Sequence, residues 1–386
     1  MGDPADQLQG RRAQATWRGP VQARLVRALE LSPATVASWG SLHERALEQN
    51  PFFEPACVIA AARHLPHGEQ IRVLLAEEDG TVLGCMPLRR MPRWHWSRRA
   101  TFTTDIRRLT WLGTPLLDRT RADEAMTAML THLRDRRRRS GDHMLAVERM
   151  HTGGAVDQVV CAAAARLRLP LVVVERYERP VYLQLPMGSD GEDPAPVRRQ
   201  HRLPERRRKL ATRVGPVEVL ERAGDPTAVD DLIDLETQGY KGREGIALSS
   251  FPGETEWFKE MCAGFAAEGR LVLPCLTAGG KILALNAMVT AGDETFACVG
   301  AYDEAFRAYS PGAQLRYDTM DLLARARFRS IDWCTYRTSG EVDETFPDRI
   351  EIGIVLVGLG SPVERMLLGA LPTARRARFW LSLIHI

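Results

Sequence analysis

The chain has 386 residues, a formal net charge of +3 at pH 7, 45% hydrophobic residues and 26% charged residues. This composition is typical of a globular protein, so it excludes a largely disordered chain and a polycation that would indicate nucleic-acid binding. Because 386 residues exceed what a single hydrophobic core usually supports, we expect two domains.

The seven cysteines are scattered, with no CxxC pair and no close cluster with histidine. We therefore expect free thiols in a reducing compartment, no disulfide framework and no metal site. The first residues, MGDPADQLQGRR, lack the apolar core of a signal peptide, and the longest apolar run, 352–359, is too short for a membrane span. These features predict a cytoplasmic protein.

The first half opens with a polar, arginine-rich stretch, residues 1–30, that we expect to be poorly ordered. Apolar residues at helical spacing and β-rich runs predict the elements that follow. The predicted helices are 34–49, 54–65, 122–138 and 155–167, and the predicted strands are 71–78, 81–90, 109–118, 143–148, 171–178 and 180–185. Asp79-Gly80 between two of these strands is a strong hairpin signal.

A linker separates the halves. Residues 187–196, MGSDGEDPAP, are rich in Gly, Pro, Ser and acid, and residues 198–213 then gather nine basic side chains against the single acid Glu205. We interpret 187–213 as a linker and a basic helix. A solvated helix joining two domains is favoured over a phosphate or RNA surface, because no aromatic residues are interleaved for base stacking.

The second half repeats the order of predicted helices and strands in the first half. Its predicted helices are 226–237, 254–268 and 313–327, and its predicted strands are 217–221, 270–278, 281–291, 294–302, 330–335 and 349–357. Gly279-Gly280 and Gly292-Asp293 are turn signals that indicate an antiparallel meander. The helix between 294–302 and 330–335 allows these two strands to lie parallel.

Each half thus has helices, an antiparallel hairpin or meander, and then a strand–helix–strand crossover. We predict two tandem domains of mixed α/β class, each a mostly antiparallel sheet flanked by helices, at residues 31–186 and 214–380. The last six residues, LSLIHI, match the translation of a common sequencing adapter, so we exclude 381–386 from the fold.

Residues 299–318, VGAYDEAFRAYSPGAQLRYD, combine a strand end, a polar loop and a Pro-Gly step into a helix. The start of a helix leaves several backbone N–H groups without intrahelical partners, which favours a phosphate or a developing negative charge there. The alternative is an ordinary strand–loop–helix connection, since such a loop is a weak signal by itself.

Four side chains near this segment are candidates for chemistry. Glu236 and Lys241 belong to LETQGYKGREGIAL, where a glycine-rich loop follows a helix. Asp303 is an acid able to accept a proton from an amine or hydroxyl, and Tyr302 is a phenol able to protonate a departing thiolate. The alternatives are a surface or capping acid for Glu236, a solvated loop lysine for Lys241 and a turn residue for Asp303.

The sequence contains no HExxH, GxSxG, P-loop or Rossmann fingerprint, which removes most support for hydrolases, kinases and dehydrogenases. It resembles instead the GNAT-like acyltransferases of the CelD/BcsL group, which are related to the FemAB-like double-GNAT proteins. The matching stretches are WGSLHERALEQNPFFEPACVIAAARHL (39–65), RVLLAEEDGTVLGCMPL (72–88), LGTPLLD (112–118), RRQHRLPERRRKL (198–210), LETQGYKGREGIAL (235–248) and AYDEAFRAYSPGAQL (301–315).

The resemblance implies two GNAT domains in tandem, with the acyl-CoA site in the second and no metal. The GNAT pyrophosphate loop is usually written Q/R-x-x-G-x-G/A. Arg307 and Gly312 match it, Ser310 stands for its first glycine, and Pro311 removes one N–H donor. Arg307, Ser310 and Gly312 are therefore the expected pyrophosphate residues, with acetyl-CoA or another acyl-CoA as co-substrate.

The implied mechanism is direct attack of an amine or hydroxyl on the thioester within one ternary complex. Backbone N–H groups would polarise the carbonyl, and Glu236, Lys241, Tyr302 and Asp303 are the expected acceptor-side and proton-transfer residues. The implied acceptor is a polysaccharide, a cell-envelope precursor or another small amine or hydroxyl compound. Two alternatives stay open: a non-catalytic partner in exopolysaccharide biosynthesis, and a transferase that uses aminoacyl-tRNA.

Overall fold

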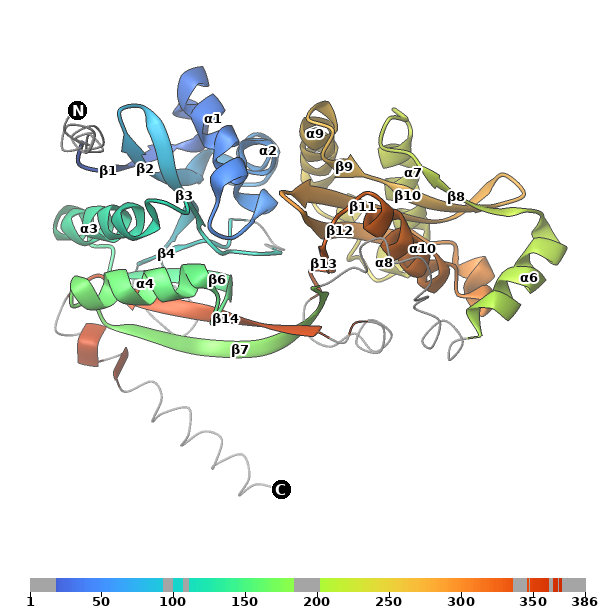
Figure 1. Cartoon of the computed structure of the whole chain (residues 1–386). Helices are drawn as coiled ribbons and strands as arrows, with labels where there is room; N and C mark the ends of the chain where they lie inside the picture. Colours follow the sequence, from blue (N-terminus) through green and yellow to red (C-terminus); the bar gives the residue numbers. More distant parts are fainter. Residues whose placement is uncertain are drawn as a thin grey trace, which may run out of the picture.

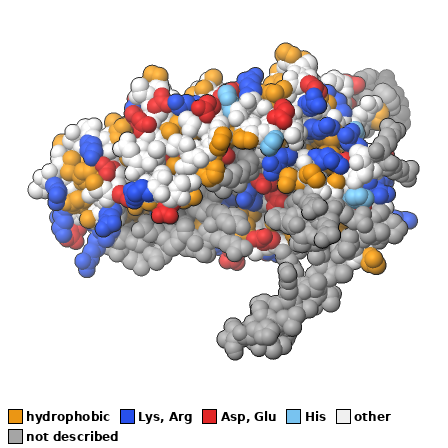
Figure 2. Space-filling model, turned by 180° about the vertical axis from the view of Figure 1, so that it is seen from behind, with side chains coloured by type: hydrophobic (Ala, Val, Ile, Leu, Met, Phe, Trp, Pro, Cys, Tyr) orange, Lys and Arg blue, Asp and Glu red, His pale blue; other side chains and the backbone are white. Residues whose placement is uncertain are grey.

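The computed structural model describes residues 19–92, 100–106, 111–183, 202–335, 346, 348–360, 364–366 and 368–369, without the side chains of residues 138 and 139. Figure 1 shows two halves side by side, the first blue to green and the second yellow to orange. A red strand near the C-terminal end of the chain lies in the first half (Figure 1). On the face seen in Figure 2, acidic and basic side chains are interspersed, in keeping with the small net charge.

The first half contains seven of the described strands, four α-helices and four 3-10 helices. Its strands are β1 (Gln22–Arg27), β2 (Arg72–Glu78), β3 (Thr81–Met91), β4 (Thr101–Thr103), β5 (Leu116–Leu117), β6 (Met144–His151) and β7 (Leu171–Tyr182). Its α-helices are α1 (Pro33–Gly40), α2 (Pro55–His64), α3 (Ala122–Ser140) and α4 (Ala155–Arg166). Its 3-10 helices are η2 (Ala28–Glu30), η3 (Ser41–Arg45), η4 (Pro51–Phe53) and η5 (Gly68–Gln70).

The second half begins with the basic helix. Its helices are α6 (Leu203–Val214), α7 (Ala228–Gln238), α8 (Tyr240–Arg243), η6 (Leu248–Ser250), α9 (Glu254–Ala267), η7 (Glu304–Tyr309) and α10 (Pro311–Arg325). Its strands are β8 (Val217–Glu221), β9 (Leu271–Val272), β10 (Pro274–Ala278), β11 (Lys281–Ala291), β12 (Glu294–Tyr302), β13 (Ser330–Asp332) and β14 (Asp348–Gly358).

One continuous sheet runs through both halves, in the order β1-β2-β3-β4-β6-β14-β7-β13-β12-β11-β10-β8. Only two neighbouring pairs in this order are parallel, β4 with β6 and β12 with β13. In each half, therefore, an antiparallel meander is followed by a helix (α3 or α10) and a parallel strand. This repeated order confirms the predicted fold class, with crossover helices in the expected places.

The end of the chain completes the sheet of the first half. Strand β14 lies between β6 and β7 and pairs antiparallel with both. Strand β7 in turn pairs with β13 through Val181 and Tyr182, so it joins the two halves edge to edge. The buried side chains of Ile352, Val355 and Val357 place β14 in the main hydrophobic core.

Helices α7 and α10 pack on opposite faces of the second half's sheet. Along β11, Leu285 and Ala287 belong to the cluster that includes Leu232 of α7. Ala284, one residue away, instead packs with Leu315 of α10. Side chains of consecutive strand residues point to opposite faces, so this alternation fixes the two helices on either side of the strand.

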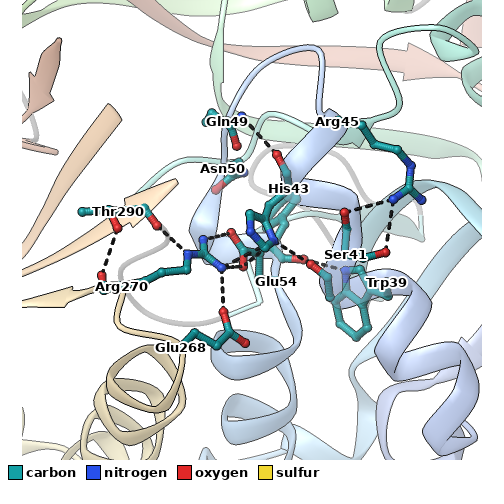
Figure 3. Close-up of polar contacts among 12 residues, drawn as sticks. Trp39, Ser41, His43, Arg45, Gln49, Asn50, Glu54, Glu268, Arg270 and Thr290 are labelled. Atoms are coloured by element: carbon teal, nitrogen blue, oxygen red, sulfur yellow. Dashed lines mark hydrogen bonds and ion pairs between the residues drawn. The ribbon is translucent and has the colours of Figure 1, made fainter. Parts of the chain in front are cut away.

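A buried ion pair also connects the halves. Glu54, which precedes α2, accepts hydrogen bonds at both carboxylate oxygens from Arg270, at 2.6 Å each. Figure 3 shows His43 and Glu268 around the same guanidinium. The bidentate geometry is the strong form of a carboxylate–arginine contact, and Glu54 is only 3% exposed, which shields the pair from water.

Turn chemistry predicted the hairpins correctly. Asp79 and Gly80 both have positive φ values, 48° and 79°, as a two-residue turn between right-twisted strands requires. The predicted meander 270–302 and the parallel pairing of β12 with β13 are confirmed.

Other local predictions were wrong. Residues 22–27, expected to be poorly ordered, form β1, which pairs with β2 along its whole length. The strands predicted at 171–178 and 180–185 are one strand, β7, that continues through Pro180 to Tyr182; residues 184–185 lie outside the described part of the chain.

Two predicted elements of the first half are shorter than expected. The helix predicted at 34–49 ends at Gly40, and the 3-10 helix η3 follows. Arg45 is held there by Asp118, at 2.7 Å, and by the carbonyl of Val82, which turns the chain toward β5. Of the strand predicted at 109–118, the described residues show only β5.

Candidate functional site

The candidate site is built where β12 leads through η7 into α10. Ser310 stands between the two helices with φ 52° and ψ 54°, a left-handed conformation that few non-glycine residues adopt. Pro311 is the first residue of α10. Proline lacks a backbone N–H, and it suits this position because the first N–H of a helix has no intrahelical partner. The N–H groups of Gly312 and Ala313 follow, and no capping side chain of the described residues bonds to them.

Strands β12 and β13 diverge as they approach this helix start. They pair at only three positions, from Glu294 opposite Ser330 to Phe296 opposite Asp332. Strand β12 continues to Tyr302, whereas β13 ends at Asp332. The part of β12 next to α10 therefore has a free edge among the described residues, on which an extended ligand has room to pair with backbone groups.

A bulge bends β12 in the same region. Ala287 pairs with Val299 and Met288 pairs with Ala297, so the register of the two strands shifts by one residue at Cys298. Beyond the bulge, a side chain at Gly300 would meet the Asn286 amide oxygen at 2.3 Å. A side chain at position 300 would therefore require the Asn286 side chain to move.

The structure brings Glu236 and Lys241 together on the α7 side of β12. Lys241 Nζ donates to Glu236 Oε1 at 2.8 Å and to the carbonyl oxygen of Gly300 at 3.0 Å. The second oxygen of Glu236 accepts from the N–H of Leu248 at 2.9 Å. Glu236 is only 4% exposed, so this carboxylate is satisfied by partners instead of water.

The short helix α8 holds this pair against the loop. Glu304 of η7 accepts hydrogen bonds from the backbone N–H of Tyr240 and from the guanidinium of Arg243. The bond to Arg243 is the main cause that lowers the pKa of Glu304. A side chain at Gly242 would come within 1.8 Å of the Thr237 carbonyl oxygen, so the tight step from α7 into α8 depends on glycine.

The basic helix α6 reaches the loop from the other side. Arg206 donates from its guanidinium to the Ser310 hydroxyl, and Arg207 forms an ion pair with Asp318 of α10 at 2.6 Å. Leu210 is fully buried and belongs to a cluster with Phe306 and Tyr309 of η7. Sequence reasoning missed Arg206; the seven-residue spacing of Leu203 and Leu210 was the signal that one face of this helix is packed.

The remaining predicted residues fall into two groups. Gly312 and Tyr302 are adjacent, because a Cβ at Gly312 would meet the Tyr302 ring at 3.5 Å, and Arg307 is exposed on η7. Asp303 instead accepts from the N–H of Ala305 at 2.9 Å and pairs with Lys281 at 2.7 Å. These are the contacts of a turn residue, and they differ from those of the Glu236–Lys241 pair.

Two negative findings apply to the residues that the structure describes. None of their His, Cys, Asp and Glu side chains form a group of three or more that could hold a metal ion. Within the same ranges, no helix has the length and hydrophobicity needed to cross a bilayer.

A parallel strand pair that opens beside a helix start, after an antiparallel meander, is the architecture that the sequence resemblance implied. Residues 198–341 match the family model described as "Acetyltransferase (GNAT) domain". This stretch, which holds β8 to β13, is similar to that family over 144 of the 386 residues of the chain. The more specific CelD/BcsL assignment stays a prediction, and no curated protein matches the chain.

Solved structures share the fold across both halves. The C-terminal domain of a putative lysylphosphatidylglycerol synthetase from Agrobacterium fabrum aligns with TM-score 0.53 and 12% identity, covering 86% of this chain and 94% of that one. FemX aligns with TM-score 0.55 and 9% identity over 83% and 95%. A conserved protein of unknown function from Bacteroides thetaiotaomicron aligns with TM-score 0.55 and 10% identity over 84% and 97%. These similarities show a fold that extends across both halves, and the second half contains the stretch that matches the GNAT model.

Proposed function

We propose that the protein is an acyl-CoA-dependent N- or O-acyltransferase whose donor site lies between the diverging ends of β12 and β13 and the start of α10. The observation that carries this proposal is the position of the opening. Among the described residues, β12 has a free edge that ends beside the N–H groups of Gly312 and Ala313, which have no partner there, inside the stretch that matches the GNAT model. An extended pantetheine arm suits the strand edge, and a pyrophosphate suits the helix start.

The donor loop departs from the usual pattern but retains groups that suit an anion. Pro311 takes away one N–H donor, and Ser310 stands where a glycine is usual. Arg206 lies against Ser310 and Arg307 extends from η7, so two guanidinium groups are available near the helix start. We assign Arg206, Arg307, Ser310 and Gly312 to the pyrophosphate, since arginine donors pair well with phosphate oxygens.

The proposed reaction is a direct transfer. The amine or hydroxyl of the acceptor attacks the thioester carbonyl, the C–S bond breaks, and the acyl group moves to the acceptor. We assign Glu236 and Lys241 to the acceptor side, where the carboxylate takes the acceptor's proton, and Tyr302 to protonation of the thiolate. Asp303 is kept as a further acceptor-side candidate, although its contacts with Ala305 and Lys281 give it a turn role as well.

The finer assignments are also proposals. We place the domains at residues 31–186 and 214–380, with β1 and β14 added to the first and α6 to the second. The proposed acceptor is a glycan, a cell-envelope precursor or another small amine or hydroxyl compound in the cytoplasm. Aminoacyl-tRNA is the second candidate donor, because Arg202, Arg208 and Arg213 are exposed along α6.

Titration with acetyl-CoA tests the proposal. We expect saturable binding that Arg307→Glu weakens by about tenfold or more, because the reversed charge repels the pyrophosphate. Arg325→Glu reverses the charge of an exposed arginine at the C-terminal end of α10, the end opposite to the donor loop. We expect this variant to leave binding unchanged. Absence of acetyl-CoA binding at millimolar concentration would sink the proposal. Binding of tRNA with a steep salt dependence would favour the second donor.

A further inference from the structure

A cavity of about 270 Å³ lies at the junction of the two halves, away from the donor loop. The second half lines it with residues of β12 and β13, among them Glu294, Phe296 and Asp332. The first half contributes Glu48, Gln49 and His151. The volume is a little below the roughly 300–1,000 Å³ of sites for drug-sized molecules, so it suits a smaller ligand.

The ionised groups around the cavity are mostly paired with one another. Glu48 accepts from His151 at 3.0 Å and from the N–H of Val156 at 2.8 Å. Asp332 accepts from the buried guanidinium of Arg179 at 2.6 Å. Arg329, at the rim, pairs with Asp293, which is not part of the lining.

Two hydrogen-bond acceptors in the lining lack donors among the described residues. The carboxylate of Glu294 makes no hydrogen bond or ion pair with any of them, although the residue is partly buried. The amide oxygen of Gln49 is buried without a partner, while its nitrogen donates to the carbonyl of His43 at 3.1 Å, as Figure 3 shows. That bond fixes which end of the amide is the acceptor, so the orphan group is an oxygen.

The electrostatics of Glu294 agree with this geometry. Burial first, and then the negative charges of Asp293, Asp332 and Glu48, raise the pKa of Glu294 to about 7, and Arg329 opposes them least strongly. A carboxylate in such surroundings is costly unless a cation approaches it. The hydrogen bond between His151 and Glu48 raises the pKa of His151. His151 is therefore paired with Glu48 and not with the Glu294 carboxylate.

The cavity lies where the pairing of β12 with β13 ends, because its lining includes Phe296 and Asp332, and the donor loop lies further along β12. Glu294 is the first residue of β12, and Gly300 lies six residues further on, which is roughly 20 Å along a strand at 3.3 Å per residue. The apolar part of the lining, with Leu112, Phe296 and Ile350, adds a surface that suits a short hydrocarbon chain.

We propose that this junction cavity binds a small molecule that carries a primary ammonium group on a short apolar chain. The ammonium group donates to the Glu294 carboxylate, in a lining that also includes Gln49, and the chain lies against the apolar lining. A primary ammonium has three N–H donors, and its charge supplies a counter-ion for Glu294, which forms no ion pair with the described residues. The inference is independent of the proposed acyl transfer, since no residue of the donor loop takes part.

The probe is n-butylammonium, titrated calorimetrically into the full chain at pH 7. We expect saturable millimolar or tighter binding, with n-butanol, which lacks the charge, and tetramethylammonium, which lacks N–H donors, about tenfold weaker or worse. Because roughly half of the Glu294 carboxyls are protonated at pH 7, binding should release protons, detected by comparing buffers of different ionisation enthalpy.

Two variants locate the effect. Glu294→Gln keeps the shape of the side chain, and we expect it to weaken n-butylammonium binding by about tenfold and to abolish the proton release. Asp234→Asn removes an exposed charge on α7, outside the lining, and we expect binding to change by less than about twofold. A thermal melt confirms that each variant is folded. No saturable binding of the probe, equal binding of n-butanol, or an unchanged affinity in Glu294→Gln would overturn the proposal.

Discussion

Glu236 and Lys241 form the pair on which the acceptor side of the site depends. Glu236 is almost fully buried, and Lys241 supplies its only cationic partner among the described residues. The same lysine holds the carbonyl of Gly300, so it links α7, α8 and β12. Removing one member of a buried pair leaves an uncompensated charge, which costs more than the pair contributes.

We therefore predict that Lys241→Met lowers the free energy of unfolding by about 3 kcal/mol, near the low end for buried pairs because the lysine side chain is 26% exposed. The double variant Glu236→Gln, Lys241→Met should recover at least half of this loss, since the orphaned charge is gone. Urea unfolding measures both. A double variant less stable than Lys241→Met alone would contradict the explanation.

Glu294 should make stability fall as pH rises through neutrality. Its folded-state pKa of about 7 lies above the ordinary 4.5, so its favourable contribution is complete below pH 4.5 and is lost by about pH 7. The raised pKa of His151 acts with the same sign, from pH 6.5 upward. We predict that Glu294→Gln is about 1–2 kcal/mol more stable than the parent at pH 8 and nearly equal at pH 4.5. Thermal melts at both pH values check this, and equal stabilities at pH 8 would refute it.

Sequence reasoning located some site residues and missed others for a physical reason. Glu236 and Lys241 were found because both lie in one short glycine-rich segment beside a helix end. Arg206 and Ser310 are 104 residues apart, and Glu54 and Arg270 are 216 apart. Contacts of that range depend on the tertiary fold, and no local pattern in a single sequence encodes them.

At the scale of elements, the position of α8 depends on one glycine. Gly242 allows α8 to pack tightly against the end of α7, since a Cβ there would overlap the carbonyl oxygen of Thr237. The helix in turn places Lys241 under β12 and binds Glu304 of η7. The clash involves backbone on both sides, so a flexible side chain cannot relieve it.

We predict that Gly242→Ala displaces α8 and lowers the free energy of unfolding by about 2–3 kcal/mol, as overpacking and loss of the Lys241 contacts combine. Gly224→Ala is the matched control, because a Cβ at Gly224 meets nothing within 4 Å and its φ is not positive. Urea unfolding of both variants gives the comparison. Equal stability of the two variants would show that α8 tolerates a side chain at this step.

Element prediction was most accurate where turns have strict chemistry. Asp79-Gly80 and Gly292-Asp293 located hairpins correctly, because positive φ values restrict which residues such turns accept. It was least accurate for β1 and β7. The stretch around β1 looks polar, and this strand is stabilised by its pairing with β2. Pro180 suggested a break between two strands, but β7 is continuous there, and Pro180 pairs with Arg349 of β14.

At the scale of the whole molecule, the two halves are not independent units. Strand β14 pairs with β7 at ten positions and with β6 at six, yet it follows the whole second half in sequence. Nothing in residues 348–358 distinguishes a strand of the second sheet from one returned to the first, since alternation and apolar content are the same in both cases. The exchange was therefore not predictable from the sequence pattern.

The exchange has a consequence for truncation. Ile352, Val355, Leu356 and Val357 are fully buried, and burying four such side chains stabilises a fold by about 6–12 kcal/mol. That is comparable to the roughly 5–15 kcal/mol by which domains are stable. We predict that a chain ending at Thr335 loses native structure in its first half, because β6 and β7 are left with exposed edges and an open core.

Hydrogen exchange of β6 amides measures this loss, and aggregation is its expected accompaniment. A peptide of residues 346–360, added in trans, should restore protection in β6, because it supplies the missing strand without any covalent link. A chain shortened only by residues 381–386 is the control and should keep full protection. If the chain ending at Thr335 retained protected β6 amides without the peptide, the first half would fold without β14, and the shared sheet would be a docking contact instead of a requirement for folding.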